Sequence, residues 1–470
     1  MEKWIPHSYM RRCVARCIKE KYQALFLDPG LGKTSILLRV AKTLIDAGEI
    51  KGVLVVVPLR PMYLTWPNEI KKWGNLYQSY TILHSEFGGI EKGINGQQTN
   101  IYLINPEGLK KLREVLKGKR ATSWPFDMLI VDESTKFKYV NTARFKYLKP
   151  MLPKFKRRYI ATGTPIPNSL IDIQGQMFIV DQGEAFGGTR SHFTTRFFKR
   201  VGRPEWDNWK PNEDTIEGLY RKVAKRSIRL RARDHLTLPK RVNNFISIRL
   251  PRKAMREYRR MEDEFYMAWD KDGVMALSSS AARQKCHQIA NGCVYKSTNP
   301  DAAEQEKREF FIIHEEKIKA LQDLIDELQS KPLLIAYRFK HDLWMLKKHI
   351  KGLTVFDGGT LKDAAKIESD WNAGKIQTLA LYPGTNALGL NLQQSGEDVC
   401  YYSMIDDFEA YEQLILRLER QGSTASHIRV HHLIGEDTVD EAIQQAITVK
   451  AFNQDRFNQY LEEYRVRIPF

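Results

Sequence analysis

The chain has 470 residues, of which 42% are hydrophobic and 28% are charged, a composition typical of globular proteins. Basic residues (74) outnumber acidic ones (56), and the formal net charge of +18 favours a polyanionic partner, nucleic acid before an acidic membrane surface. No apolar run approaches the roughly 20 residues of a membrane span, and the N-terminus lacks the core of a signal peptide. Five cysteines form neither a disulfide framework nor a zinc pattern, so we expect a reducing cytoplasm.

The first motif lies between the apolar run Ala24–Leu27 and a helical pattern that follows it, and it reads Asp-Pro-Gly-Leu-Gly-Lys-Thr-Ser. A glycine-rich turn at a helix start directs backbone N–H groups at phosphate oxygens. Leu27 stands where the strict pattern has glycine, so the setting between strand and helix carries the assignment. We expect a nucleoside triphosphate to be bound here, with Lys33 at the outer phosphates and the Thr34 hydroxyl on Mg²⁺. The binding residues are predicted to be Gly30, Gly32, Lys33, Thr34 and Ser35.

A second motif places two carboxylates, Asp132 and Glu133, directly after the apolar run Met128–Val131. At the end of a buried strand, Asp132 can hold the metal ion, and Glu133 can orient and deprotonate a water molecule. Together with the glycine-rich turn, this pair predicts hydrolysis of the bound triphosphate.

Near-continuous apolar runs alternate with helical patterns in both halves of the chain, which predicts two doubly wound α/β lobes with parallel sheets. We expect lobe 1 at 1–241, with a helical insertion at about 182–241, and lobe 2 at 242–470, with a helical insertion at about 251–300. Further strands are predicted at Val53–Val57, Tyr80–His84, Ile101–Ile104 and Tyr159–Ala161, then at Val242–Leu250, Leu333–Tyr337, Leu353–Phe356, Thr378–Leu381, Val399–Ser403 and Ile428–Leu433.

Three further motifs follow predicted strands or helices. Thr162-Gly-Thr-Pro165 follows a strand, and Leu388-Gly-Leu-Asn-Leu392 follows another. Gln413, Arg417 and Arg420 are spaced i, i+4 and i+7, which would put them on one helix face. Arginines so placed can neutralise charge on a γ-phosphate. The spacing equally allows a solvated face whose arginines form ion pairs with Glu412 or Glu419.

In their order, these motifs resemble those of a superfamily-two helicase motor of the Swi/Snf type. Pro58–Trp66 resembles that family's motif Ia, Asp132-Glu-Ser-Thr135 stands where the family has its acidic motif, and Thr162–Pro165 resembles motif III. Three further segments resemble the compact form of the family that bacteriophages carry: Gln284–Tyr295, Gly389–Gln393 and Arg417–Gly422.

The resemblance implies two RecA-like lobes that bind ATP and Mg²⁺ at a shared cleft and move along double-stranded DNA. It assigns catalysis to Lys33, Asp132, Glu133, Gln413, Arg417 and Arg420. It adds Tyr9 and Gly389 to the nucleotide site, and it gives Thr162 and Thr164 a role in coupling. Met10 and Thr135 depart from the family, which has an adenine-reading glutamine and a histidine at these positions.

A motor that slides along DNA needs contacts that ignore sequence, and contacts to backbone phosphates meet this requirement. The candidates for DNA binding or coupling are Arg60, Trp66, Asn105–Gly108, Arg338, Lys340, Gly359 and Thr360. We interpret Trp66 as half-buried packing in preference to a base-stacking residue. The run 221–241 holds nine basic residues and one acid, which suits a DNA contact and a solvated face equally.

We therefore predict a monomeric, DNA-stimulated ATPase that translocates on duplex DNA, with branched or forked duplexes among its candidate substrates, in the host cytoplasm of a phage. The rival interpretations are an RNA helicase, a packaging-type motor and a DNA-binding scaffold with an inactive ATPase. The sequence gives no biological target or partner protein.

Overall fold

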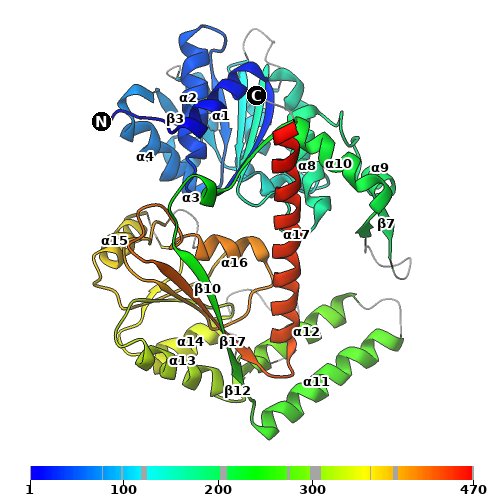
Figure 1. Cartoon of the computed structure of the whole chain (residues 1–470), viewed down its shortest axis with the longest axis vertical. Helices are drawn as coiled ribbons and strands as arrows, with labels where there is room; N and C mark the ends of the chain where they lie inside the picture. The colour runs from blue at the N-terminus through cyan, green and yellow to red at the C-terminus, as the bar shows by residue number, and fades with distance from the viewer. Residues whose placement is uncertain are drawn as a thin grey trace. The chain divides into compact units, whose positions relative to one another are not determined.

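The computed structural model describes residues 2–76, 78–96, 99–117, 124–201, 209–271, 276–296, 309–359, 361–384 and 390–467. The chain forms two compact units (Figure 1). Unit 1 comprises Met1–Thr237 and Phe452–Phe470, and unit 2 comprises Leu238–Ala451. The expected boundary after residue 241 therefore lies after Thr237, and the last stretch of the chain belongs to unit 1 and not to the expected lobe 2.

Unit 1 contains a seven-stranded sheet in the order β3-β4-β2-β5-β6-β1-β9, in which all neighbouring strands are parallel. The inner strands are buried almost throughout, which explains their continuous apolar sequences. Six strands confirm the predicted positions to within a few residues: β1 (Tyr22–Leu27), β2 (Val53–Val56), β3 (Tyr80–Ile82), β4 (Ile101–Ile104), β5 (Met128–Asp132) and β6 (Arg157–Thr162).

Helices connect these strands and enclose a large apolar core. They are α1 (Ser8–Lys19), α2 (Lys33–Asp46), α3 (Leu59–Tyr63), α4 (Thr65–Lys72), α5 (Ile90–Asn95), α6 (Leu109–Leu116), α7 (Ala143–Leu148) and α8 (Ile173–Asp181). Segment 182–241 adds α9 (Arg190–Phe197), the hairpin of β7 (Phe198–Arg200) and β8 (Trp209–Pro211), and α10 (Glu213–Lys225).

The same segment also contains β9 (Ser227–Leu230), which the sequence analysis missed. This strand pairs with β1 and forms the edge of the main sheet, so segment 182–241 is not purely a helical insertion. The strand was missed because Arg229 interrupts the short apolar run, and a basic residue in such a run suggests a solvated surface.

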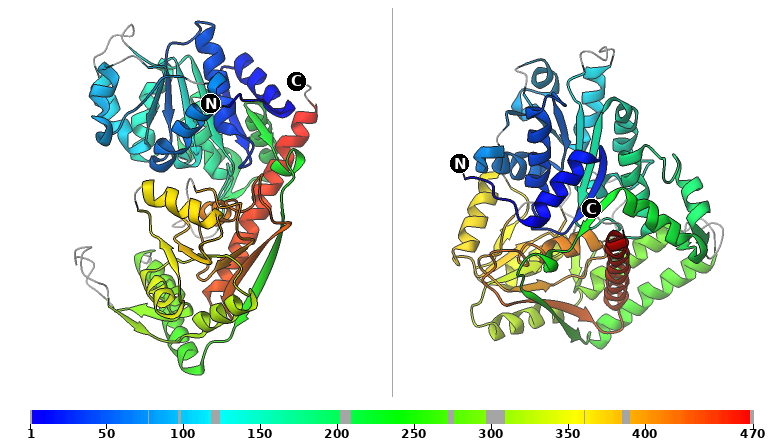
Figure 2. Two further views of the ribbon diagram at one scale, coloured as in Figure 1. Left: turned by 90° about the vertical axis from the view of Figure 1, so that its left-hand side faces the viewer. Right: turned by 45° about the horizontal axis from the view of Figure 1, so that its top comes forward.

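Unit 2 contains a six-stranded sheet in the order β10-β17-β16-β13-β15-β14, again with parallel neighbours. Figure 2 shows β10 alongside β17. The strands confirm the predicted positions: β10 (Lys240–Ile248), β13 (Leu333–Ala336), β14 (Thr354–Phe356), β15 (Thr378–Leu381), β16 (Asp398–Tyr401) and β17 (His427–Gly435).

The predicted helical stretch at 251–300 is present as α11 (Arg252–Lys271) and α12 (Ala276–Ala290), which pack against each other. A small hairpin follows, formed by β11 (Cys293–Tyr295) and β12 (Phe310–Ile312). The remaining helices are α13 (Glu316–Glu327), α14 (Lys340–His349), α15 (Leu361–Asn372), α16 (Phe408–Ile415) and α17 (Val439–Arg467). None of the helices that the structure describes is long and apolar enough to cross a membrane.

Helix α17 starts in unit 2, but its residues from Phe452 onward belong to unit 1 (Figure 1). Phe457 and Leu461 lie in the apolar core of unit 1, and the Phe457 ring meets the ring of Tyr220. Burial of these side chains explains why the C-terminal stretch departs from the predicted domain division.

Candidate functional site

The predicted motifs of unit 1 meet because β5, β6 and β1 are neighbours in one parallel sheet. The glycine-rich loop follows β1, the acidic pair ends β5, and Thr162–Pro165 ends β6. The carboxyl ends of parallel strands share one edge of a sheet, which is where ligands bind in such folds. Three motifs that are far apart in the sequence therefore form one site.

The glycine-rich loop has the backbone that its sequence predicts. Gly30 and Gly32 have φ angles of +85° and +71°, which other residue types rarely adopt. Helix α2 begins at Lys33, whose Nζ donates to the carbonyl oxygen of Leu27 at 2.9 Å. The Ser35 hydroxyl donates to the carbonyl of Gly32 at 3.0 Å. Ser35 thus stabilises the loop itself.

Tyr9 and Met10 of α1 lie beside this loop. The Tyr9 side chain is buried and stacks on the His235 ring with a centroid distance of 4.6 Å, a contact that the sequence analysis missed. A Cβ atom at Gly32 would lie 2.7 Å from Cε of Met10. Met10 therefore packs on the loop, where the family pattern has a polar side chain.

Asp132 is partly buried at the end of β5 and held by defined donors. Its Oδ2 accepts from Nε1 of Trp66 at 2.9 Å, and its Oδ1 accepts from the backbone N–H of Glu133 at 3.1 Å. Burial raises the pKa of the Asp132 carboxyl, while the hydrogen bond from Trp66 and the charge of Lys33 partly offset this rise. Glu133 has a φ of +49°, a left-handed conformation that costs about 1–3 kcal/mol for such a residue.

The candidate DNA contacts of unit 1 are less exposed than expected. Trp66 is completely buried, not half-buried, and its indole bonds to Asp132, so in this structure it offers no surface for a base. Arg60 of α3 is partly buried, and burial lowers its pKa. Asn105 is buried and donates to Glu107 at 3.1 Å. Trp66 thus connects motif Ia to the acidic motif.

The Thr162–Pro165 loop packs directly on the glycine-rich loop. Thr162 and Thr164 are buried, and Thr162 Oγ1 accepts from the backbone N–H of Thr164 at 3.2 Å. A Cβ atom at Gly163 would lie 2.9 Å from Cδ of Pro29, so only glycine allows this approach. Close packing of the two loops is the arrangement that coupling between them requires.

Gln176 of α8 joins this loop to the acidic motif, which the sequence did not indicate. Its Oε1 accepts from the Ser134 hydroxyl at 2.7 Å, and its Nε2 donates to the carbonyl of Pro165 at 2.6 Å. The neighbouring Thr135 is also buried.

The predicted helix face for Gln413, Arg417 and Arg420 is wrong. Helix α16 ends at Ile415, and the Arg417 and Leu418 N–H groups donate to carbonyls only three residues before them. Only Gln413 is helical, so the regular angular spacing is lost after it.

Both arginines nevertheless approach the Leu388–Leu392 motif. A terminal nitrogen of Arg417 lies 3.5 Å from the carbonyl of Leu390, and Arg420 donates to the side chain of Asn391. Gly389 itself lies outside the described residues.

Glu412 and Glu419 form ion pairs with Arg241 of β10, at 2.7 and 2.8 Å. Burial disfavours the charged guanidinium, but the two carboxylates outweigh this effect and raise the pKa of Arg241. The sequence analysis allowed these glutamates to pair with Arg417 or Arg420. The ion pairs that the structure records for them are with Arg241.

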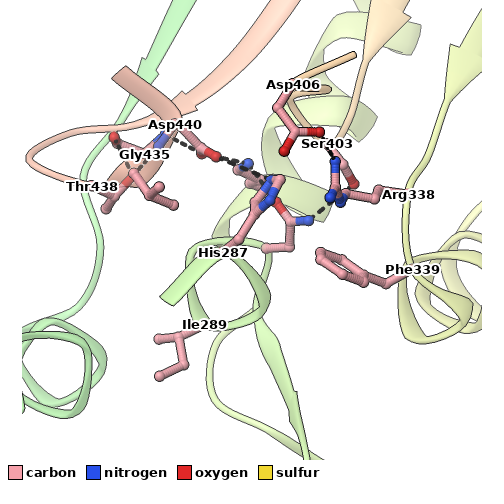
Figure 3. A network of polar contacts seen from close by, with 12 residues as sticks. His287, Ile289, Arg338, Phe339, Ser403, Asp406, Gly435, Thr438 and Asp440 are labelled. Carbon is pink, nitrogen blue, oxygen red and sulfur yellow. Dashed lines mark hydrogen bonds and ion pairs between the residues drawn. The ribbon is translucent and has the colours of Figure 1, made fainter. Parts of the chain in front are cut away.

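The candidate DNA contacts of unit 2 cluster at the start of α14. Lys340 is exposed, and Arg338 forms an ion pair with Asp406 (Figure 3). Burial raises the pKa of Asp406, but the adjacent Arg338 reverses this and lowers it. Gly359 is exposed in another loop, and Thr360 lies outside the described residues.

A buried polar network supports this loop and explains the stretch Gln284–Tyr295. Asn291 accepts from the Lys317 ammonium at 2.7 Å and donates to the Ser403 hydroxyl at 3.0 Å. Lys317 also pairs with Asp440 at 2.6 Å, and both side chains are fully buried.

The network ends at Asp342, to which the Ser403 hydroxyl donates. Asp342 accepts from the backbone N–H groups of Arg338 and Phe339 at 3.2 and 2.8 Å. The backbone beside Lys340 is thus fixed by a network that includes Asn291.

The run 221–241 is less available to DNA than its composition suggests. Arg229 and Arg231 are buried, and they pair with Asp28 and Glu462 at 2.6 and 2.7 Å. These two arginines act inside unit 1.

The donor set at the carboxyl edge fits Mg²⁺, which prefers hard oxygen ligands and usually keeps water and phosphate ligands. Asp132 supplies a partly buried carboxylate, and Thr34 supplies a hydroxyl in the first turn of α2. Within the described part of the chain, no three His, Cys, Asp or Glu side chains are grouped as a metal site.

The fold and this edge define a nucleoside-triphosphatase site of the phosphate-loop kind. The chain belongs to the SNF2-related family, because residues 9–306 match the model of the SNF2-related domain. It is an ATP-hydrolysing enzyme of the Swi/Snf type in superfamily two, in the compact form found in phages.

Relatives extend over nearly the whole chain. A putative protein p41 of Acyrthosiphon pisum secondary endosymbiont phage 1 is 32% identical, covering 97% of this chain and 98% of its own. The uncharacterized ATP-dependent helicase YqhH of Bacillus subtilis is 24% identical, covering 95% and 78%. The Sulfolobus solfataricus SWI2/SNF2 ATPase core in complex with dsDNA is 21% identical, covers 97% and 94%, and superposes with a TM-score of 0.43.

Proposed function

We propose that the chain is a DNA-stimulated ATPase that couples hydrolysis to translocation on duplex DNA in phage DNA metabolism, for example in remodelling or branch migration. The observation that carries this proposal is the meeting of three motif loops at the edge of β5, β6 and β1 in a member of the SNF2-related family. The net charge of +18 supports a nucleic-acid partner. We further propose that it acts as a monomer in the host cytoplasm.

In this proposal each residue of the edge has a separate task. Lys33 moves from the carbonyl of Leu27 to the outer phosphates, and Thr34 and Asp132 hold Mg²⁺, which supplies charge neutralisation when bound. Glu133 accepts a proton from the attacking water, and its fixed left-handed backbone orients the carboxylate. Gly163 contacts Pro29, so a movement of the phosphate loop shifts the loop that holds Thr162 and Thr164.

One assay separates the candidate functions. ATP turnover would be measured with single-stranded DNA, duplex DNA, forked DNA and RNA at equal nucleotide concentration. We expect the largest stimulation by duplex or forked DNA. Stronger stimulation by RNA would favour an RNA helicase. DNA binding without turnover would favour an inactive scaffold, and DNA-end cleavage would favour a packaging motor.

A first prediction concerns the support of Asp132 by Trp66. Replacing Trp66 with Phe keeps the ring but removes the N–H that bonds to Asp132 at 2.9 Å. We expect the Mg²⁺ concentration for half-maximal ATPase activity to rise about 10-fold, the size of effect that partners of metal ligands have. Trp73→Phe is the matched control, because it removes a similar bond to Glu69. Equal Mg²⁺ dependence of the two variants would contradict the assignment.

A second prediction concerns the DNA track. Arg338 and Lys340 would contact backbone phosphates, each of which contributes about −0.9 to the slope of log affinity against log salt. We expect Arg338→Gln with Lys340→Gln to make this slope less steep by up to about 2 and to weaken binding to all duplexes alike. ATP binding at Lys33 should be unchanged.

The control for this prediction is the pair Lys319→Gln and Lys331→Gln, which removes the same charge from two exposed residues that pair with glutamates. Salt titrations of binding to two unrelated duplexes of equal length provide the measurement. An unchanged slope, or a loss confined to one sequence, would count against a track at Arg338.

A further inference from the structure

The first residue of the phosphate loop, Asp28, is held by an edge strand. Its Oδ1 pairs with Arg229 at 2.6 Å, and its Oδ2 accepts from the backbone N–H of Ala232 at 2.9 Å. Arg229 also donates to the carbonyl of Phe26 at 3.0 Å, and only 3% of its side chain is exposed. The start of the loop is thus fixed to β9 by a partly buried ion pair.

The C-terminal part of α17 completes this ion pair network. Oε1 of Glu462 lies 2.7 Å from Nε of Arg231 and 3.8 Å from Nε of Arg229. Charges therefore alternate from Asp28 through Arg229 to Glu462, and each guanidinium has a carboxylate beside it. Such a chain of partly buried charges depends on the presence of every member.

The same helix contacts the second motif loop. Oε1 of Gln454 accepts from the backbone N–H of Ile166 at 3.0 Å, and Gln454 Nε2 donates to Asn458 at 3.0 Å. Gln454 and Asn458 are buried, and Ile166 directly follows the Thr162–Pro165 motif. Residues 454, 458 and 462 are spaced by four, so one helix face carries both connections.

We propose that this face of α17, formed by Gln454, Asn458 and Glu462, positions the phosphate loop and the Thr162–Pro165 loop for ATP. Glu462 acts through Arg229 on Asp28, and Gln454 acts on the backbone at Ile166. These are positioning residues that touch neither substrate nor metal. The inference rests on the proposed ATPase activity and adds to it a part of the chain that no motif covers.

Attachment to two loops of one site distinguishes this arrangement from ordinary helix packing. Apolar packing of α17 in unit 1 already comes from Phe457 and Leu461 in the core. The polar face instead contacts two loops. Glu462 is connected to the phosphate loop through Arg229, and Gln454 bonds to the end of the loop that packs against it through Gly163.

The test compares Glu462→Gln with Glu463→Gln in the full chain. Both variants remove one negative charge from the same helix, but Glu463 is exposed and accepts from Gln459 of that helix at 3.2 Å. We expect Glu462→Gln to raise the KM for ATP about 10-fold, which corresponds to about 1.4 kcal/mol, with a smaller change in kcat. Glu463→Gln should match the wild type in both constants.

A double-mutant cycle tests the route of the effect. If Glu462 acts through Arg229 on Asp28, Asp28→Asn and Glu462→Gln should be non-additive in KM for ATP. Arg231→Lys provides a second variant with a preserved charge, and it should shift the KM in the same direction by a smaller factor. Thermal unfolding of each variant shows whether the fold is retained.

The outcomes separate this inference from the proposed function. A wild-type chain without ATPase activity would overturn both. An active wild type with equal KM for Glu462→Gln and Glu463→Gln would overturn the positioning role alone. A lowered Tm with unchanged KM would also overturn it, because α17 would then only stabilise the fold.

Discussion

Replacing Glu133 with Gln is expected to lower the ATP turnover rate about 10²- to 10⁴-fold, the range typical for the loss of a general base. The amide keeps the shape of the side chain but cannot accept a proton from water. Binding of ATP should persist, because the loop at Gly30–Ser35 and the Asp132 carboxylate are unchanged. Single-turnover hydrolysis and titration with a fluorescent ATP analogue would measure the two properties separately.

The control for this variant is Glu114→Gln, since Glu114 is exposed on α6 and forms an ion pair with Lys111 at 3.8 Å. It should retain turnover. The left-handed backbone of Glu133 makes its orientation a fixed property of the loop, so the amide should occupy the same position. Near-normal turnover of Glu133→Gln would refute its role as the base.

The parallel sheets could be predicted because their inner strands are buried on both faces and read as continuous apolar runs. Strand β9 could not, because its buried Arg229 is neutralised by Asp28, a partner about 200 residues away in the sequence. The phosphate-loop pattern does not specify the residue at position 28, and the structure shows that Asp28 serves as the partner of Arg229. A buried ion pair between distant residues leaves no local signal in either segment.

The helix end at Ile415 was missed for a different reason. Residues 416–420 are mostly good helix formers, so local propensity favours continuation. Tertiary contacts override it: Arg420 bonds Asn391, and Leu418 is buried in the unit 2 core. Propensity is a weak prior where such contacts are available.

The motif loops of the site could be located from sequence, but their supports could not. Trp66 was identified in motif Ia, but its bond to Asp132 was not predicted. Gln176 and Gln454 belong to no motif, and the fold brings them to Pro165 and Ile166 from two other helices. The supporting residues therefore required the structure.

The last prediction concerns Arg417 and Arg420, whose replacement by Ala should each lower the hydrolysis rate by roughly 10³-fold, the lower end of the effect of an arginine finger. We propose that both guanidiniums meet the γ-phosphate in the working enzyme, where charge develops as the phosphoryl group leaves. In this structure both arginines lie in the turn after α16, where they contact Leu390 and Asn391.

Affinity for ATP should change less than the hydrolysis rate, since an interaction made mainly in the transition state lowers kcat more than it weakens binding. Arg417→Lys and Arg420→Lys keep the charge but lose the planar fork, so intermediate rates are expected. Arg249→Ala is the control, because the Arg249 side chain is 88% exposed and pairs only at the surface with Glu436. Wild-type hydrolysis rates in both alanine variants would show that neither arginine is catalytic. Turnover would then have to be explained by Glu133 and Lys33 of unit 1.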